Sequence, residues 1–509
     1  MSRPLHFDPE ESARQHGEEH LIPPTLASIS RTSSGERNGA SGAKMIDLEY
    51  DATELGNARR LVDRHGDDLR YAEGRGWMAW DGRRWRPGAK GDVIRKAKDV
   101  ARRLKVEAAT TTDRQAAKEL FRWALRSQGA YVINKTVELA WSEPEIELAL
   151  GDLDVDPWLL NVRNGTLDLR TGELREHRRE DLITKLAPID YDPVARSELW
   201  DRFIDETMGG DADLVRYLQK AAGYSLTGDT GEEVIFFGHG PAASGKSTFM
   251  SATKTVLGDY AMTADFETFL ARRYGGGIRN DIARLAGARL VSSIEVEEGK
   301  QLAEGMVKEL TGGDDVTARF LHREHFTFKP AFKLWLIANH KPRVRDDDEA
   351  IWRRIRVIPF EHPVPKEKRD SRVKAELADA SRSGAAILSW MVTGCMEWQR
   401  DGLGAPQRVE KATDDYRAEM DVTARFWEEC VIFAAEHFTT TADLRKRYKA
   451  WADANDVDRF LRLDDKNMAE RLRAKGCKDD KVKQRRGWWG IQLRSTAAEG
   501  DGDGAGDAW

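Results

Sequence analysis

The chain has 509 residues, enough for two to four domains of ordinary size, and a hydrophobic content of 40% excludes a disordered protein. A net charge of −6 provides no overall attraction to nucleic acid, so any basic surface must be local. Three widely separated cysteines exclude a CxxC pair and suit a reducing cytoplasm, and no uncharged apolar run reaches the roughly 18 residues of a membrane span.

The N-terminal part of the sequence predicts a tail followed by a small α+β domain. Residues 1–45 are rich in Ser, Gly, Glu, Arg and Pro, so we interpret them as a disordered tail. Residues 46–150 begin with an amphipathic helix and continue with a small sheet that carries Trp77, Trp80 and Trp85. These tryptophans could stack on nucleic-acid bases, but burial in the core of the sheet is the favoured interpretation.

A second β-rich stretch precedes the central domain and then becomes helical, over residues 151–228. It begins close to an Asp-Val-Asp sequence in which Asp154 and Asp156 could ligate a divalent metal. The proline that follows predicts a loop instead, and no third ligand is evident, so a structural role is favoured.

The central domain, residues 229–365, alternates short apolar strands with helical segments, which predicts an α/β fold with a mainly parallel sheet. Its strongest signal is GPAASGKS, which follows the apolar strand Val234–Phe237 and matches the phosphate-binding pattern GxxxxGK[ST] at every position. Such a loop surrounds phosphates with backbone N–H groups, while its lysine reaches the β and γ phosphates and its serine binds Mg²⁺. We therefore expect ATP and Mg²⁺ as cofactors. The expected nucleotide-binding residues are Gly240, Pro241, Ala242, Ala243, Ser244, Gly245, Lys246, Ser247 and Thr248.

A hydrolysing site also needs an acid beside the metal. The predicted strand Leu290–Ile294 ends at Glu295, which could hold Mg²⁺ and polarise the attacking water. Glu297 is the alternative, because a strand longer by two residues keeps the same face, whereas Glu298 fits a solvated turn.

Two further polar positions follow in chain order. The predicted strand Phe332–Ala338 ends at Asn339, whose amide could orient the attacking water. Arg353 and Arg354 begin a last strand; either could stabilise charge on a neighbouring subunit's nucleotide, or belong to a solvated basic edge.

Beyond the central domain we expect a helical connector over residues 366–420, a basic domain over 421–495 and a disordered acidic tail over 496–509. From Asp443 to Arg494 there are sixteen Lys and Arg against nine Asp and Glu. This excess, with Trp488 and Trp489 nearby, favours phosphate contacts plus stacking over a merely solvated basic face. The candidate DNA contacts are Lys481, Lys483, Arg485 and Arg486.

The order and spacing of these motifs resemble a superfamily 3 helicase, and more narrowly the phage and plasmid primase–helicase family related to the poxvirus primase-helicase. The resemblance covers roughly residues 150–495 and is dense from 234 to 362. It implies an AAA+-like P-loop core and a winged-helix-like C-terminal domain. It also implies Lys246, Ser247, Glu295, Asn339 and Arg354 (or its neighbour Arg353) as catalytic residues.

The resemblance further implies what the protein does. It suggests an ATP-dependent DNA helicase of phage or prophage replication, in the bacterial host cytoplasm, that acts on single-stranded and forked DNA as a homohexameric ring. A hairpin over Arg319–Phe326, with His322 and Arg323 near its tip, would grip DNA in the channel. The chain departs from full-length members in lacking an evident primase acid set, so we expect priming by a separate primase. The alternative function is a DNA-binding initiator or loader ATPase that assembles on DNA without processive unwinding.

Overall fold

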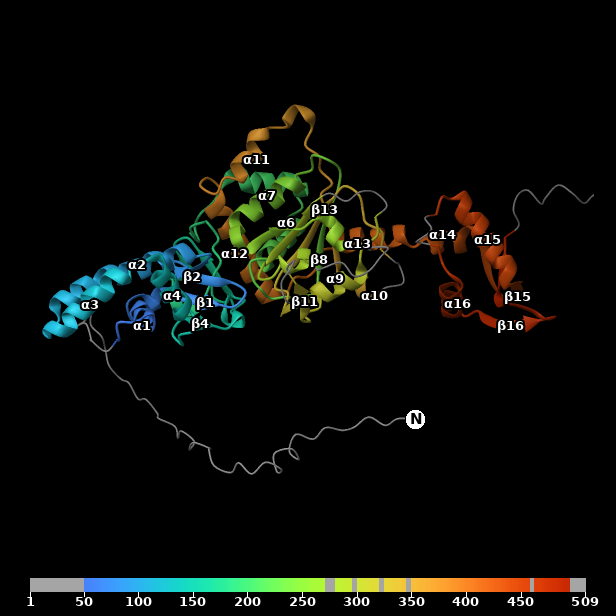
Figure 1. Ribbon diagram of the computed structural model, residues 1–509. Helices are drawn as coiled ribbons and strands as arrows, with labels where there is room; N and C mark the ends of the chain where they lie inside the picture. Colours follow the sequence, from blue (N-terminus) through green and yellow to red (C-terminus); the bar gives the residue numbers. More distant parts are fainter. Residues whose placement is uncertain are drawn as a thin grey trace, which may run out of the picture. The chain divides into compact units, whose positions relative to one another are not determined.

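The computed structural model describes residues 50–270, 280–294, 300–319, 325–344, 349–457 and 462–494 (Figure 1). The expected tails, 1–45 and 496–509, lie outside these ranges. Among the described helices, none combines the length and the apolar character that crossing a bilayer requires.

The first domain combines a four-stranded sheet with four helices. The sheet has the order β3-β2-β1-β4. Its elements are α1 (Glu54–His65), β1 (Leu69–Ala72), β2 (Gly76–Trp80), β3 (Trp85–Pro87), α2 (Lys90–Thr110), α3 (Arg114–Arg126), α4 (Ala130–Ala140) and β4 (Glu147–Leu148). Trp85 is fully buried and Trp77 is 8% exposed, while Trp80 is half-buried against Trp85. The core interpretation of these tryptophans is therefore confirmed for Trp77 and Trp85.

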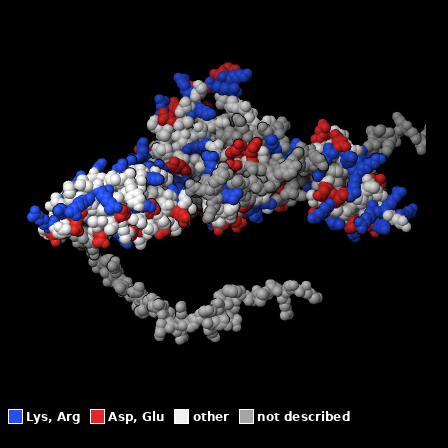
Figure 2. Space-filling model, viewed as in Figure 1, with Lys and Arg blue, Asp and Glu red and all other residues white. Residues whose placement is uncertain are grey.

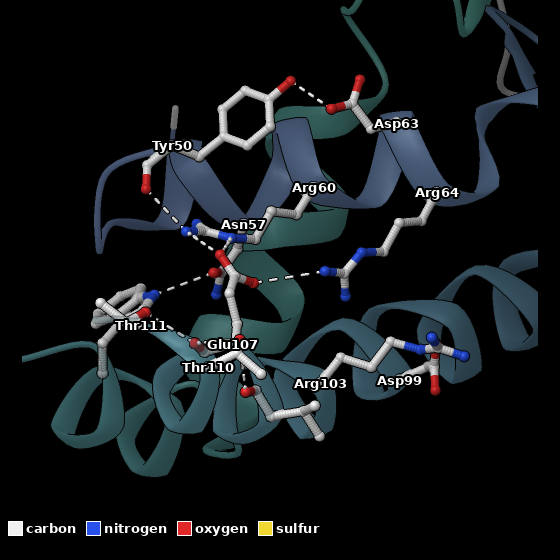
Figure 3. A network of polar contacts seen from close by, with 12 residues as sticks. Tyr50, Asn57, Arg60, Asp63, Arg64, Asp99, Arg103, Glu107, Thr110 and Thr111 are labelled. Carbon is white, nitrogen blue, oxygen red and sulfur yellow. Dashed lines mark hydrogen bonds and ion pairs between the residues drawn. The ribbon is translucent and has the colours of Figure 1, made fainter. Parts of the chain in front are cut away.

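A buried ion pair joins the first two helices (Figure 3). The Arg60 guanidinium on α1 donates to Glu107 Oε1 on α2 through Nε and Nη2, at 3.1 and 3.0 Å. Both side chains are no more than 3% exposed. Arg64, one turn further along α1, donates to the other carboxylate oxygen at 3.5 Å. The network fixes how α1 lies on α2, because neither charge could remain buried without the other.

A second small sheet contains β5 (Leu159–Val162), β6 (Gly165–Asp168) and β7 (Glu173–Arg175). The Asp-Val-Asp sequence before it is structural. Asp154 accepts hydrogen bonds from the backbone N–H and the hydroxyl of Thr184, and Asp156 forms an ion pair with Arg170 at 2.8 Å. Within the described ranges, no cluster of three or more His, Cys, Asp or Glu could hold a metal ion.

The central domain is built on a five-stranded parallel sheet of order β14-β8-β13-β10-β9, which confirms the predicted α/β fold. The strands are β8 (Ile235–His239), β9 (Ala261–Thr263), β10 (Leu290–Ile294), β13 (Lys333–Ala338) and β14 (Ile355–Pro359). Side chains alternate between two separate cores: Phe236 enters one, and Ile235 and Phe237 enter the other. Burial on both faces explains why these strands are almost continuously apolar.

Helices cover both faces of this sheet (Figure 1). One face packs against α5 (Glu198–Met208), α6 (Ala212–Tyr224), α7 (Lys246–Leu257), α11 (Ser371–Leu377) and α12 (Gly384–Asp401). The other packs against α8 (Asn280–Ala283), α9 (Glu304–Thr311), α10 (Glu349–Trp352) and α13 (Gln407–Met420). A hairpin of β11 (Val316–Arg319) and β12 (His325–Phe328) extends from this second side.

The C-terminal unit has its own core and the element order helix-strand-helix-helix-strand-strand. These are α14 (Val422–Cys430), β15 (Val431–Thr440), α15 (Thr441–Ala454), α16 (Asp465–Ala474), β16 (Lys478–Val482) and β17 (Arg485–Leu493). The strands form an antiparallel sheet of order β15-β17-β16.

Candidate functional site

The glycine-rich loop, Gly240–Ser247, joins the carboxyl end of β8 to the start of α7. Gly240 has φ 155°, and a Cβ there would lie 1.9 Å from the Phe360 carbonyl oxygen. Gly245 has φ 87°, and its Cβ would lie 2.7 Å from Thr207 Oγ1. Both glycines are therefore required by close packing as well as by backbone conformation.

Lys246 is folded into this loop. Its Nζ donates to the carbonyl oxygens of Gly240 and Pro241, both at 2.7 Å, and to Ser244 Oγ at 3.1 Å. The residue is 6% exposed, and its burial lowers the pKa of the ammonium group. No side chain caps the N-terminus of α7, and Ser247 in its first turn is exposed. An uncapped helix N-terminus beside an ammonium group can bind an anion, for which Lys246 would exchange its loop contacts.

The next two strands bring their carboxyl ends to the same edge of the sheet. β13 lies directly beside β8, with Ala338 opposite His239, and Asn339 follows as an exposed residue. β10 lies on the other side of β13, with its last residue, Ile294, opposite Ile337. Ligands of parallel α/β sheets bind at this edge. Glu295, Glu297 and Glu298, the candidate acids that follow Ile294, lie outside the described residues.

His239 at the end of β8 was not singled out by the sequence analysis. Its half-buried ring is hydrogen-bonded to the backbone of Asn339, and burial lowers its pKa, assisted by the charges of Lys341 and Lys246. The His239 ring therefore joins the start of the glycine-rich loop to the Asn339 backbone, in surroundings that disfavour its protonated form. No spacing rule could identify it, because a histidine at the end of a strand is ordinary and its partner follows another strand.

Arg353 and Arg354 lie at the opposite edge of the sheet. The Arg354 carbonyl accepts from Ile235 N–H at 2.7 Å, and β14 then runs parallel to β8 as far as Pro359 opposite His239. Five residues of strand separate the arginines from the glycine-rich loop, or about 16 Å at 3.3 Å per residue. An arginine side chain cannot cover this distance within one subunit.

Glu233 distinguishes the two arginines. Its carboxylate lies 2.7 Å from Arg354 Nη2 and 3.2 Å from Arg353 Nη2. The Arg354 side chain is 8% exposed, whereas that of Arg353 is 65% exposed. Arg353 can therefore reach another molecule, and Arg354 is held inside.

The candidate DNA contacts fall into two groups. His322 and Arg323 lie outside the described residues, between the paired strands β11 and β12. Lys481, Lys483, Arg485 and Arg486 are all exposed on the β16–β17 hairpin, whose two-residue turn is Lys483–Gln484 with φ 46° and 66°.

The two neighbouring tryptophans differ from the expectation. Trp488 is 5% exposed and belongs to the core of the C-terminal unit, so its assignment as a stacking residue is wrong. Trp489 is half-buried, with its ring beside Phe438 and its Nε1 donating to Asp480. Alternation along β17 turns one of two adjacent tryptophans inward.

Two family models match the chain. One, described as D5 N terminal like, matches residues 58–209, and the other, described as a family of unknown function (DUF5906), matches residues 238–354. A protein named "putative helicase" in Acanthamoeba polyphaga mimivirus is 26% identical over 344 residues, covering 64% of this chain and 35% of its own length. A "putative helicase" of Frog virus 3 is 25% identical over 404 residues, covering 64% of this chain and 41% of its own length. A "putative primase" of African swine fever virus is 26% identical over 340 residues (61% and 35%).

These matches support assigning the chain to the phage and viral primase–helicase family. The chain spans only about 35–41% of the length of those relatives. Among solved structures, it is similar to the apo A form of the NrS-1 C-terminal region, with 9% identity, a TM-score of 0.47 and coverage of 87% of this chain and 100% of the other. A second apo A-form structure of that region has 11% identity and a TM-score of 0.43, with coverage of 71% of this chain and 89% of the other.

Proposed function

We propose that this primase–helicase chain is an ATP-dependent DNA helicase of phage or prophage replication, with a P-loop core of the AAA+-like superfamily 3 type. The observation that carries the proposal is the glycine-rich loop at the carboxyl edge of the parallel sheet. There Lys246 is held by three acceptors of its own loop, beside an uncapped helix N-terminus. This is the chemistry that binds the phosphates of a nucleotide.

The residues present fit ATP and Mg²⁺. Lys246 and the N–H groups of the glycine-rich loop would hold the phosphates, and the Ser247 hydroxyl and Glu295 would hold the metal. When bound, Mg²⁺ supplies positive charge to the phosphate oxygens. Asn339, next to the loop at the same edge, would orient the water that attacks the γ-phosphate.

ATP would be held between two subunits of a ring. Arg353 and Arg354 lie about 16 Å of strand from their own glycine-rich loop. A γ-phosphate that loses its bond needs added positive charge, which an arginine from a neighbour can supply. Exposure favours Arg353 as this arginine, with Glu233 as a positioning residue whose carboxylate holds the side chains of both arginines. The count of six subunits comes from the family resemblance alone.

DNA would be contacted by two elements. The β11–β12 hairpin carries the segment with His322 and Arg323, and the β16–β17 hairpin presents four exposed cations. The helix-strand-helix-helix-strand-strand order of the C-terminal unit supports a winged-helix-like DNA-binding domain, in which β16 and β17 form the wing.

Strand displacement on a forked duplex tests this function. The wild-type chain should displace the labelled strand with ATP and Mg²⁺, and the Lys246→Ala variant should not. DNA-stimulated ATP hydrolysis without displacement would overturn the helicase assignment and favour the initiator or loader. Absence of both hydrolysis and displacement would remove the P-loop assignment as well.

A further inference from the structure

The helical hairpin of α2 and α3 carries more positive charges than its acidic residues can pair with. Residues 90–126 contain eleven Lys and Arg and five Asp and Glu. All five acids are engaged: Asp92 and Asp99 pair with cations beside them, and Glu107 pairs with Arg60 and Arg64 of α1. Asp113 caps α3, and Glu119 accepts from Gln115.

Eight cations of this hairpin have no acid within ion-pair distance in the described part of the chain. Two of them are Lys90 and Arg126, and the other six share two helix faces: Lys98, Arg102, Lys105, Arg114, Lys118 and Arg122. Those on α2 follow a spacing of four and three residues, and those on α3 a spacing of four, so each set lies on one side of its helix. Figure 2 shows Lys and Arg along this part of the molecule.

Large apolar side chains lie in the same two stripes. Val106 on α2 is 58% exposed, and Phe121 and Leu125 on α3 are 48% and 53% exposed. Phe121 and Leu125 are three and seven residues after Lys118, and flank Arg122. The opposite sides of both helices pack together through Leu104, Leu120 and Trp123. The exposed stripes therefore take no part in the packing of α2 against α3.

We infer that the exposed stripes of α2 and α3 bind single-stranded DNA, as a further contact outside the two hairpins assigned above. Unpaired cations at helical spacing match a phosphate backbone, and an exposed phenylalanine among them offers a stacking surface for an unpaired base. Duplex DNA would leave that ring unused, because its bases are already stacked. The inference rests on the proposed function for the choice of DNA as the polyanion.

The test uses the full chain without nucleotide and a fluorescein-labelled oligothymidylate of about 30 nucleotides, with binding followed by anisotropy at several KCl concentrations. The variant Lys98→Ala/Arg102→Ala/Lys118→Ala/Arg122→Ala removes four unpaired cations. Its affinity should fall by at least about tenfold at 0.1 M salt, and the slope of log K against log salt should flatten by up to about 2.8.

A matched control removes four other exposed arginines, each of which has an acid partner: Arg163, Arg216, Arg372 and Arg400, all to Ala. The control should retain the wild-type affinity and slope. Equal losses in both variants would overturn the inference, since they would show a response to net charge alone. Thermal unfolding followed by circular dichroism checks that both variants are folded.

Phe121 separates a stacking contact from charge. Phe121→Ala should weaken binding about fivefold or more with an unchanged salt slope, whereas Phe121→Tyr should bind as wild type. Unchanged affinity of the quadruple variant for the oligonucleotide would overturn the inference. If the variant instead loses self-association in sedimentation while its affinity is unchanged, the two stripes would be assigned to contacts with a second copy of the chain. ATP hydrolysis without DNA is measured separately. Absence of ATP hydrolysis in the wild-type chain would count against the proposed function. Unchanged DNA binding in the quadruple variant would count against this inference alone.

Discussion

At the scale of single residues, Lys246 is the most informative position. Its ammonium has three acceptors within the loop and almost no contact with solvent, so it is already placed where phosphates would enter. Lys246→Ala should lower ATP hydrolysis by about 10²–10³-fold, as removal of one strong preorganised donor does elsewhere. Phosphate release measures this. Lys254→Ala, eight residues later on the same helix, is the control and should hydrolyse normally; a similar loss there would indicate damage to α7 as a whole.

A second residue-scale prediction concerns stability. Glu107→Ala leaves the buried guanidinium of Arg60 without its carboxylate, which should lower the free energy of unfolding by about 3–5 kcal/mol. Urea unfolding followed by tryptophan fluorescence measures this, because Trp123 is joined to α1 through its Nε1 hydrogen bond to Asn57. Glu119→Ala on the exposed side of α3 is the control. A loss below about 1 kcal/mol would mean that the buried pair contributes little net stability.

Residue-level predictions from sequence succeeded where the local pattern decides the outcome. Trp77 and Trp85 lie at strand spacing around an Asp-Gly turn, and both are in the core. The choice between Arg353 and Arg354 depends on Glu233, 120 positions earlier in the sequence than Arg353, and no local pattern includes it. The same holds for His239, whose partner, Asn339, directly follows β13.

At the scale of elements, the β16–β17 hairpin gathers the four cations that the sequence nominated for DNA. Changing Lys481, Lys483, Arg485 and Arg486 to Ala should flatten the salt dependence of DNA binding by about 2–4 in slope. The double variant Arg445→Ala/Arg462→Ala removes cations that have acid partners in the same unit and should change little. An unaltered slope in the quadruple variant would leave these residues as a solvated basic face.

The positions of the strands along the chain were predicted well, but the order in which they lie side by side in the sheet was not predicted. Leu290–Ile294 is found at its expected bounds, and the predicted Val234–Phe237 is found as Ile235–His239. Strands buried on both faces are visible as apolar runs between turn residues. The lateral order, which places β13 between β8 and β10, depends on how helices pack across the sheet, and apolar runs do not record that.

At the scale of the whole molecule, the chain should not make primers by itself. Asp154 and Asp156, the acid pair that could by sequence ligate the divalent metal of a nucleotide-joining site, are engaged by Thr184 and Arg170. Incubation with single-stranded template, Mg²⁺ and labelled nucleotides should yield nothing longer than background. A ladder of oligonucleotides would contradict this, and Asp154→Asn would then show whether the pair is responsible.

The last prediction concerns the ring as a whole. If ATP is held between subunits, the glycine-rich loop of one subunit must meet Arg353 of the next, because the two lie at opposite edges of the sheet within one chain. Lys246→Ala and Arg353→Ala should each be inactive alone. In a randomly mixed head-to-tail ring, an interface has an intact loop and an intact arginine in about a quarter of cases, so the mixture should recover about a quarter of the wild-type ATPase rate. Lys246→Ala mixed with Lys246→Ala/Arg353→Ala is the control, since it contains no intact loop and should recover nothing. The pair with Arg354→Ala should be tested too, because that residue also contacts Glu233. If neither arginine variant recovers activity with Lys246→Ala, although subunit exchange is shown by energy transfer between labelled chains, the shared site is wrong and each subunit completes its own.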